Sequence, residues 1–157
     1  MGTETPATEH PGELCVAGHG GPLHALAHLS VLVQRQISAV ADRNGMTPMQ
    51  ARMLGVLTAG PRRMAELAQG LGIEKAAMTG LVDRAESRGL VERTAVPGDR
   101  RSIHVVVTDA GATASTAFYR ELGESLETLI AALPPTERDV FRADTETIVD
   151  AASGERC

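Results

Sequence analysis

The side chains most able to do chemistry in this sequence are the basic residues of its middle third. Residues 62–101 carry eight arginines and lysines against six acidic residues, whereas residues 1–61 and 102–157 have net charges of −1 and −6. The net charge of the whole chain, −5, does not by itself indicate a nucleic-acid-binding protein. Because the positive charge gathers on one segment, that segment is the part able to face phosphate groups, although the same balance also suits an ordinary solvated surface.

Other residue combinations that carry chemistry are incomplete. His24 and His28 are four residues apart and could hold a metal ion, yet no carboxylate or thiol at regular spacing completes the site, so structural or exposed histidines are the favoured interpretation. Cys15 and Cys157 stand near the chain ends, outside any Cys-x-x-Cys motif. The sequence also lacks a Ser/His/Asp or Cys/His arrangement. We therefore expect neither an enzyme nor a bound metal or cofactor.

Composition predicts a single, mainly helical domain. The 157 residues are 43% hydrophobic, and the aromatic residues are Phe118, Tyr119 and Phe141, without tryptophan. The core must be built from aliphatic side chains and methionine, which suits helices better than a β-sandwich. No apolar run reaches the ~18–20 residues that cross a bilayer, and no signal pattern opens the chain, so a cytoplasmic protein without membrane contact is expected.

The basic residues must be positioned by elements that the apolar periodicity predicts. Spacing of three and four residues indicates six helices, over residues 22–43, 47–58, 64–69, 74–88, 108–133 and from 136 onward. Thr47, Pro48 and Gln50 have the types and spacing of a capping box with proline in the first turn. Thr108 is a capping residue for the fifth helix, and Gly89 is placed to end the fourth.

The periodicity changes from helix to strand after Gly89. Residues 90–94 and 103–107 are predicted strands, and Pro97-Gly98 marks a turn between them. Two short helices joined by a glycine-containing turn and followed by a hairpin form a winged helix-turn-helix. Residues 64–88 then supply a helix for the major groove, and residues 97–101 a basic tip for the adjacent minor groove, although this tip could also be a solvated turn.

The run MAELAQGLGIEKAAMTGLVDRAESRGLVER, followed by GDRRSIHVVVTDAG, resembles the multiple-antibiotic-resistance-regulator (MarR) family. The family pattern is ELA-x-x-LG, then VT-x-LVDRLE-x-x-GLV-x-R, a DRR wing and LT-x-x-G, and the match spans Thr47 to Gly111. The resemblance implies a mainly α protomer of six helices with a small β-hairpin wing. It also implies a homodimeric transcription regulator that acts as a repressor on double-stranded DNA at a pseudo-palindromic operator.

The resemblance further implies which residues bind DNA. The recognition helix, residues 74–88, would place nearest the base edges the residues Lys75, Ala76, Ala77, Thr79 and Gly80. Arg84 matches the arginine of the family's DRLE motif and would contact phosphate. In the wing, Arg101 would enter the minor groove with Asp99 orienting it, and Arg100 would touch phosphate.

Several residues depart from the family pattern. Glu74 stands where a capping Ser or Asp is usual, and Gly80 stands where Arg is frequent, at a cost of about 1 kcal/mol of helix stability relative to Ala. A distinctive operator is expected, with phosphate affinity depending more on the wing and Arg84. Arg62 and Arg63 replace an apolar residue and a threonine, and are expected to add phosphate contacts unless one arginine stem covers the core edge.

Structural alternatives exist for the helix residues. Arg84 and Arg88 could form surface ion pairs with Glu86 or Glu92, which is the favoured interpretation for Arg88. Thr79 could hydrogen-bond to its own helix backbone.

The segments on either side of the motif are expected to have other roles. Residues 1–20 form a flexible tail, residues 21–46 and 112–157 a helical dimerisation region, and residues 47–111 the winged helix-turn-helix domain. The apolar side chains of the dimerisation region exceed what the small motif can cover, so pairing across a two-fold axis is expected, the alternative being packing within one chain.

Family members commonly release DNA when a small anionic, often phenolic, compound binds between the dimer helices and the motif. The candidate ligand-binding residues, chosen because their helices flank that cleft, are His28, Arg35, Met49 and Arg52. The sparse aromatic residues predict little ring stacking for a ligand. The alternative functions are a metal- or redox-responsive sensor on the same fold, with Cys15 as the redox candidate, and a winged helix used only for protein contacts.

Overall fold

The computed structural model describes residues 21–96 and 99–154, with the side chains of residues 22–23, 96, 99–102 and 153–154 left out of the description. Its elements are α1 (Pro22–Arg43), α2 (Pro48–Thr58), β1 (Arg62–Arg63), α3 (Met64–Leu71), α4 (Lys75–Ser87), β2 (Val91–Val96), β3 (Asp99–Val107), α5 (Asp109–Ile130) and α6 (Pro135–Gly154). The predicted fold class, six helices with a small hairpin wing, is confirmed. The predicted tail, with Cys15, and the terminal Cys157 lie outside the described residues.

The sheet has one strand more than the sequence analysis predicted. β1 pairs antiparallel with β3, Arg62 opposite Val105 and Arg63 opposite His104, which makes the strand order β1-β3-β2. The hairpin of β2 and β3 is longer than predicted and contains an irregularity between Ala95 and Val96. β1 escaped prediction because two residues are too few to show a period of two.

The helix ends follow the local signals closely. In the capping box of α2, the Thr47 N–H donates to Gln50 Oε1 at 2.9 Å and the Gln50 N–H donates to Thr47 Oγ1 at 3.2 Å. Thr108 caps α5 by accepting from the Gly111 N–H at 3.1 Å. Gly89 follows α4 with a φ of +69°, the left-handed conformation that favours glycine. α5 ends at Ile130, three residues earlier than predicted, where the approach to two prolines disfavours helix.

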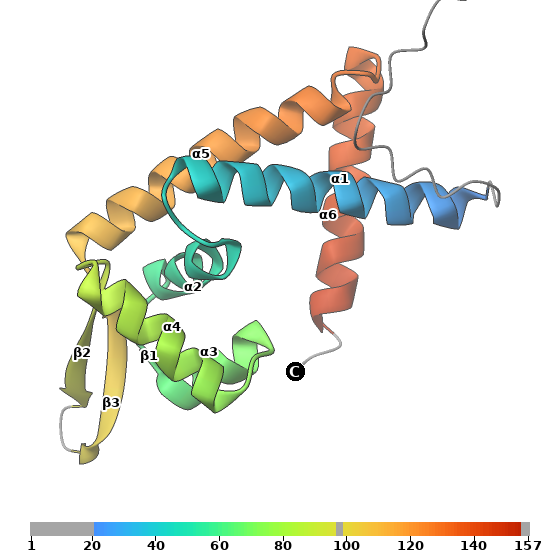
Figure 1. Cartoon of the computed structure of the whole chain (residues 1–157). Coiled ribbons are helices and arrows are strands. Elements are labelled where there is room, and N and C mark those ends of the chain that lie inside the picture. Colours follow the sequence, from blue (N-terminus) through green and yellow to red (C-terminus); the bar gives the residue numbers. More distant parts are fainter. Residues whose placement is uncertain (1–20, 97–98, 155–157) are drawn as a thin grey trace, which may run out of the picture.

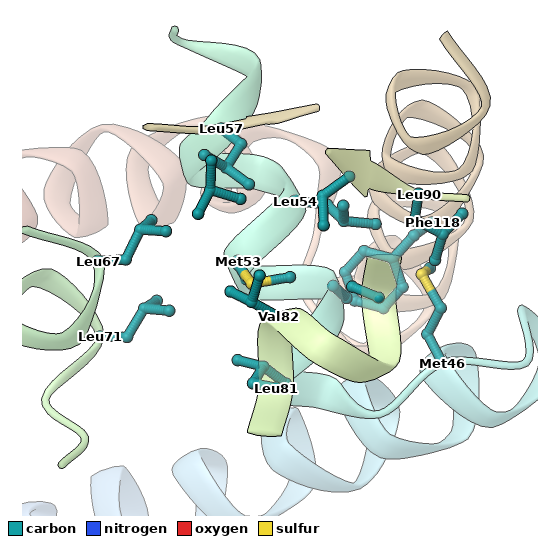
Figure 2. Packing of buried hydrophobic residues seen from close by; sticks show 14 of the residues in the cluster. Met46, Met53, Leu54, Leu57, Leu67, Leu71, Leu81, Val82, Leu90 and Phe118 are labelled. Atoms are coloured by element: carbon teal, nitrogen blue, oxygen red, sulfur yellow. The ribbon is translucent and has the colours of Figure 1, made fainter. Parts of the chain in front are cut away.

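The core lies where α2 is surrounded by α3, α4, the sheet and α5 (Figure 2). Met53, Leu54 and Leu57 of α2 are almost completely buried, and Leu67 of α3 and Val82 of α4 pack in the same cluster. Phe118 of α5 closes it as the single buried aromatic ring of the cluster. These aliphatic contacts hold the helix-turn-helix as one packed unit.

The long helices α1 and α5 contribute Val40, Ala41, Phe118 and Leu122 to this core, and much of their length extends beyond it. α1 and α5 run side by side, and α6 turns away from the end of α5 and extends past α1 (Figure 1). α6 is attached to α5 by an ion pair between Arg142 and Glu127 at 2.7 Å. Large apolar side chains are exposed on these helices at Leu26, Val31, Leu32, Tyr119, Val140, Ile148 and Val149. Within the described residues, no helix is both long and apolar enough to cross a bilayer.

Candidate nucleic-acid interface

The recognition helix α4 has one face in the core and the other in solvent. Met78, Leu81, Val82 and Ala85 are buried, so the repeat of apolar side chains at spacings of three and four fixes the helix on the domain. On the outer face, the residues expected nearest the bases are exposed, with Gly80 partly exposed, namely Lys75, Ala76, Ala77, Thr79 and Gly80. The segment is therefore sterically free to enter a groove.

The long side chains of α4 are arranged differently from the ion pairs considered as alternatives. Arg84 and Arg88 form no ion pair within the part of the chain that the structure describes. Nη1 of Arg84 lies 3.3 Å from the position that a Cβ on Gly80 would occupy, so its guanidinium lies back over that glycine. Nη2 of Arg88 lies 3.6 Å from the corresponding position on Gly45, which turns Arg88 toward the loop between α1 and α2.

Thr79 makes the backbone hydrogen bond that was considered as its structural role. Its Oγ1 donates to the Lys75 carbonyl oxygen at 3.0 Å. The bond engages the hydroxyl hydrogen, and the oxygen keeps acceptor capacity toward a base or a water molecule.

Arg93 of β2 is an important residue to which the sequence analysis gave no role. Its guanidinium pairs with Asp83 at 2.5 Å and with Glu86, and its backbone N–H donates to Glu86 Oε1 at 3.2 Å. The hydrogen bond that it donates to Asp83, together with the charges of both acids, raises the pKa of Arg93 above its ordinary value. These bonds join the recognition helix to the wing. The sequence did contain a signal for this contact. Arg93 is the one basic residue of the predicted strand 90–94, and it follows two acidic residues, Asp83 and Glu86, that are one helical turn apart.

Arg62 and Arg63 lie on β1, at the edge of the sheet away from β2. Arg62 is half-buried and donates from Nη1 to the Pro61 carbonyl at 3.1 Å, whereas the Arg63 side chain is exposed. The Arg63 N–H donates to Glu66 Oε2 at 3.0 Å, which anchors the start of α3. The half-buried stem of Arg62 fits the alternative that one of these arginines covers the core edge.

Asp99, Arg100 and Arg101 open β3 beyond the hairpin turn. The backbone of Asp99 is paired with Val96 of β2. Their side chains lie outside the described ones, so the orienting, phosphate and minor-groove roles expected of them stay predictions.

A cavity of about 440 Å³ lies between the helix-turn-helix and the long helices. Its lining comes from α1, α2 and α5 and consists of Gln34, Ile37, Pro48, Met49, Arg52, Phe118, Tyr119 and Leu122. Met49 and Arg52 were predicted for this cleft and do line it, whereas the predicted His28 and Arg35 do not. His28 and Arg35 are seven residues apart on one face of α1, and the cavity is lined by the roughly opposite side of the helix, which carries Gln34 and Ile37.

The aromatic residues are few but concentrated at this cavity. Phe118 and Tyr119 both line it, and their rings meet edge to face at 5.1 Å and 83°. Composition does not show that two of the three rings gather at one place, and the expectation of little ring stacking for a ligand stays a prediction. His28 instead lies on exposed α1, with its ring 4.8 Å from that of His24.

Comparison with known proteins assigns the helix-turn-helix to a family. The family model described as MarR family matches residues 44–102. The uncharacterized HTH-type transcriptional regulator YcgE of Bacillus subtilis is 34% identical over 88 residues, which cover 55% of this chain and 57% of the relative. The HTH-type transcriptional repressor NicR of Pseudomonas putida is 40% identical over 53 residues, 34% of each chain. Residues 44–102 of this chain therefore resemble the MarR family.

The match to these relatives is partial in length. The HTH-type transcriptional repressor MdtR of Bacillus subtilis is 31% identical over 80 residues, 50% of this chain and 52% of the relative. The chain thus aligns with about half, or less, of the curated relatives named here. MarR-family proteins are transcription regulators rather than enzymes, the class that the sequence predicted.

Solved structures of MarR-type proteins share the fold over nearly their whole length. Apo MarR of Escherichia coli has a TM-score of 0.72 at 23% identity, covering 83% of this chain and 98% of that one. MepR of Staphylococcus aureus also has a TM-score of 0.72, at 17% identity, covering 85% of this chain and 99% of that one. The MarR fold therefore includes α1, α5 and α6 as well as the family-model region.

Proposed function

We propose that this chain is a sequence-specific, double-stranded-DNA-binding repressor that works as a homodimer and responds to a small effector. The observation that carries the proposal is the pairing of an exposed recognition helix with a projecting hairpin. α4 and the β2–β3 hairpin lie next to each other at one end of the molecule (Figure 1), joined through Arg93. This arrangement suits simultaneous contact with a major groove and the neighbouring minor groove.

The proposed DNA contacts divide between bases and backbone. Lys75, Ala76, Ala77, Thr79 and Gly80 face the major groove, and Arg101, oriented by Asp99, enters the minor groove. Phosphate contacts come from the arginines of β1 and the wing, Arg62, Arg63 and Arg100, and Arg84 of α4, expected at a phosphate from the sequence, is a further residue that faces the DNA. Two curated relatives are named as repressors, and one mutant of MepR, with a TM-score of 0.63 at 18% identity, is described as bound to an oligodeoxyribonucleotide.

The dimer is proposed from apolar surface that one chain leaves exposed. On α6, Val140, Ile148 and Val149 are each more than half exposed, and α1 exposes Leu26 to 63%. α6 is 20 residues long, and a second copy of the chain packed against it would bury these apolar side chains. Such burial stabilises the dimer, since burying apolar area is worth about 25 cal/mol per Å². Residues 21–46 and 112–157 then form the dimerisation region and residues 47–111 the DNA-binding domain.

The effector site is proposed at the α1–α2–α5 cavity. Its volume falls in the range of small-molecule sites, roughly 300–1,000 Å³. Ile37, Met49 and Leu122 provide apolar walls, Tyr119 a ring, and Arg52 a guanidinium that is exposed and forms no ion pair within the described residues. This combination suits a small anionic or phenolic compound, whose binding alters the spacing of the two recognition helices and so the affinity for DNA.

The sensor alternative has no observation in its favour. Among the described residues, no three His, Cys, Asp or Glu side chains gather as metal ligands would, and Cys15 lies outside those residues. A metal- or redox-responsive role therefore stays a sequence-based alternative.

The proposed function is tested by selecting bound duplexes from a pool of random-sequence DNA with the wild-type protein. We expect enrichment of a pseudo-palindromic sequence with half-sites about one helical turn apart. Arg101→Glu should bind the enriched duplex much more weakly while sedimentation still shows a dimer, which separates DNA binding from assembly. Recovery of no preferred sequence by the wild-type protein would overturn the proposal.

A further inference from the structure

The outer face of α4 carries mostly small side chains, and the guanidinium of Arg84 lies across it. Gly80 and Arg84 are four residues apart and therefore adjacent on the same helical face. Helical side chains lean toward the N-terminus of their helix, so Arg84 extends back over the turn that contains Gly80. The 3.3 Å separation between Arg84 Nη1 and the missing Cβ of Gly80 shows that the guanidinium lies at that turn. Its charge is thus displaced toward the end of the helix that approaches base edges.

The acids next to Arg84 are occupied elsewhere. Asp83 and Glu86 both bind Arg93, which holds them on the side of α4 that faces β2. Within the described residues, Arg84 has no carboxylate partner, and its side chain is exposed. An arginine guanidinium carries five N–H donors in a planar fork, and here that fork is available to a ligand approaching the outer face.

We infer that Arg84 is the specificity-determining residue of α4, and that its guanidinium binds O6 and N7 of one guanine in each half-site rather than a phosphate. The inference rests on the proposed function and deepens it. The planar fork matches the two acceptors of a guanine edge. A phosphate is the other DNA group that this fork can bind, and the experiment below distinguishes the two. Gly80 contributes the open space in which the guanidinium lies close to the helix.

The experiment compares two duplexes: the sequence enriched by the wild-type protein, and the same sequence with its symmetric guanine pair replaced by A·T. The wild-type protein should bind the second duplex at least about 25-fold more weakly, because two bidentate base contacts are lost and each is worth about 5- to 150-fold. Arg84→Ala should bind both duplexes equally while keeping the preferences at other positions. Arg84→Lys keeps the charge without the fork, so it should lose the guanine preference and retain affinity for unrelated DNA.

Two further variants separate base reading from folding. Arg88→Ala is the matched control, because Arg88 follows on the same helix but turns toward Gly45, and it should keep the full guanine preference. Gly80→Ala places a Cβ 3.3 Å from Arg84 Nη1 and should reduce the guanine preference several-fold. Because alanine favours helix more than glycine does, the melting temperature of this variant should not fall.

The outcomes are distinguishable. If Arg84→Ala weakens binding to every duplex by one factor and lowers the salt slope by about two, one for each subunit of the dimer, Arg84 contacts a phosphate and the inference is wrong, while the regulator function stands. The inference is equally wrong if no enriched guanine depends on Arg84. If the wild-type protein enriches no sequence, the proposed function fails and the inference fails with it.

Discussion

The ring of Tyr119 packs directly against Gly55, where α5 crosses α2. A Cβ added to Gly55 would lie 2.8 Å from Cε2 and 2.9 Å from Cζ of Tyr119, closer than side chains tolerate. Glycine at position 55 therefore leaves the space that the Tyr119 ring occupies, and it also shapes the wall of the cavity that Tyr119 lines.

Gly55→Ala should force the half-exposed Tyr119 ring outward. The free energy of unfolding should fall by less than the ~1–3 kcal/mol typical of core overpacking, because the ring can move toward solvent and alanine adds about 1 kcal/mol of helix stability. Chemical denaturation of the variant measures the change. The double variant Gly55→Ala/Tyr119→Ala removes the clashing ring, so most of the loss caused by the alanine should disappear relative to Tyr119→Ala alone. If the alanine costs the same in both backgrounds, the contact between the two residues does not explain the effect.

Arg52 should provide the charge selectivity of the cavity. Tyr119 is the single tyrosine of a chain without tryptophan, so intrinsic tyrosine fluorescence reports directly on this site. Benzoate should alter that fluorescence at lower concentration than the neutral benzamide does. Arg52→Ala should weaken benzoate binding about tenfold or more, which corresponds to roughly 1.4 kcal/mol. Arg35→Ala is the matched control, because Arg35 is outside the cavity lining and should leave the titration unchanged.

Gly80→Arg should raise affinity for unrelated DNA and steepen its dependence on salt. A new guanidinium on the outer face of α4 adds a phosphate contact, and each contact increases the log–log salt slope by about 0.9. Fluorescence anisotropy with a non-operator duplex at several salt concentrations measures the slope. A slope equal to that of the wild-type protein would show that this position is too far from the DNA backbone.

Glu121 should make the packing of α1 on α5 sensitive to acid. The hydrogen bond from Arg43 at 2.5 Å, followed by that from Asn44 at 2.7 Å, lowers the pKa of Glu121 below its ordinary value of 4.5. A carboxyl whose pKa is lowered by folding stabilises the protein above its unfolded pKa, and this stabilisation is lost as the pH falls through the folded pKa. The wild-type protein should therefore melt above Glu121→Gln near neutral pH, and the difference should shrink below about pH 4.5.

Glu124→Gln is the control for this pH dependence. Glu124 lies on the same helix and pairs with Arg120 at 3.1 Å on the solvent side, so it does not join α5 to α1. Its melting temperature should follow that of the wild-type protein across the pH range. A gap between the wild-type protein and Glu121→Gln that stays constant down to acid pH would contradict the proposed linkage.

The sequence by itself determined the helix order, the caps and the hairpin. Signals such as the Thr47–Gln50 capping box and the glycine after α4 involve residues within a few positions of one another, so they can be recognised without knowledge of the rest of the chain. The motif from Thr47 to Gly111 added the resemblance to the MarR family and, with it, the residues expected at the DNA.

Only the tertiary structure decided which side chains from distant segments meet. β1 forms a strand because it pairs with β3, which lies far away in the sequence. Arg93 forms its ion pair with Asp83 because β2 places it next to α4. The cavity is lined by Phe118 and Tyr119 but not by His28, because the packing of the helices decides which face of each helix lines it. The sequence shows which face of a helix is apolar, but it does not show which other helix packs against that face. Contacts between segments dozens of residues apart depend on how whole helices pack, and no local pattern encodes that arrangement.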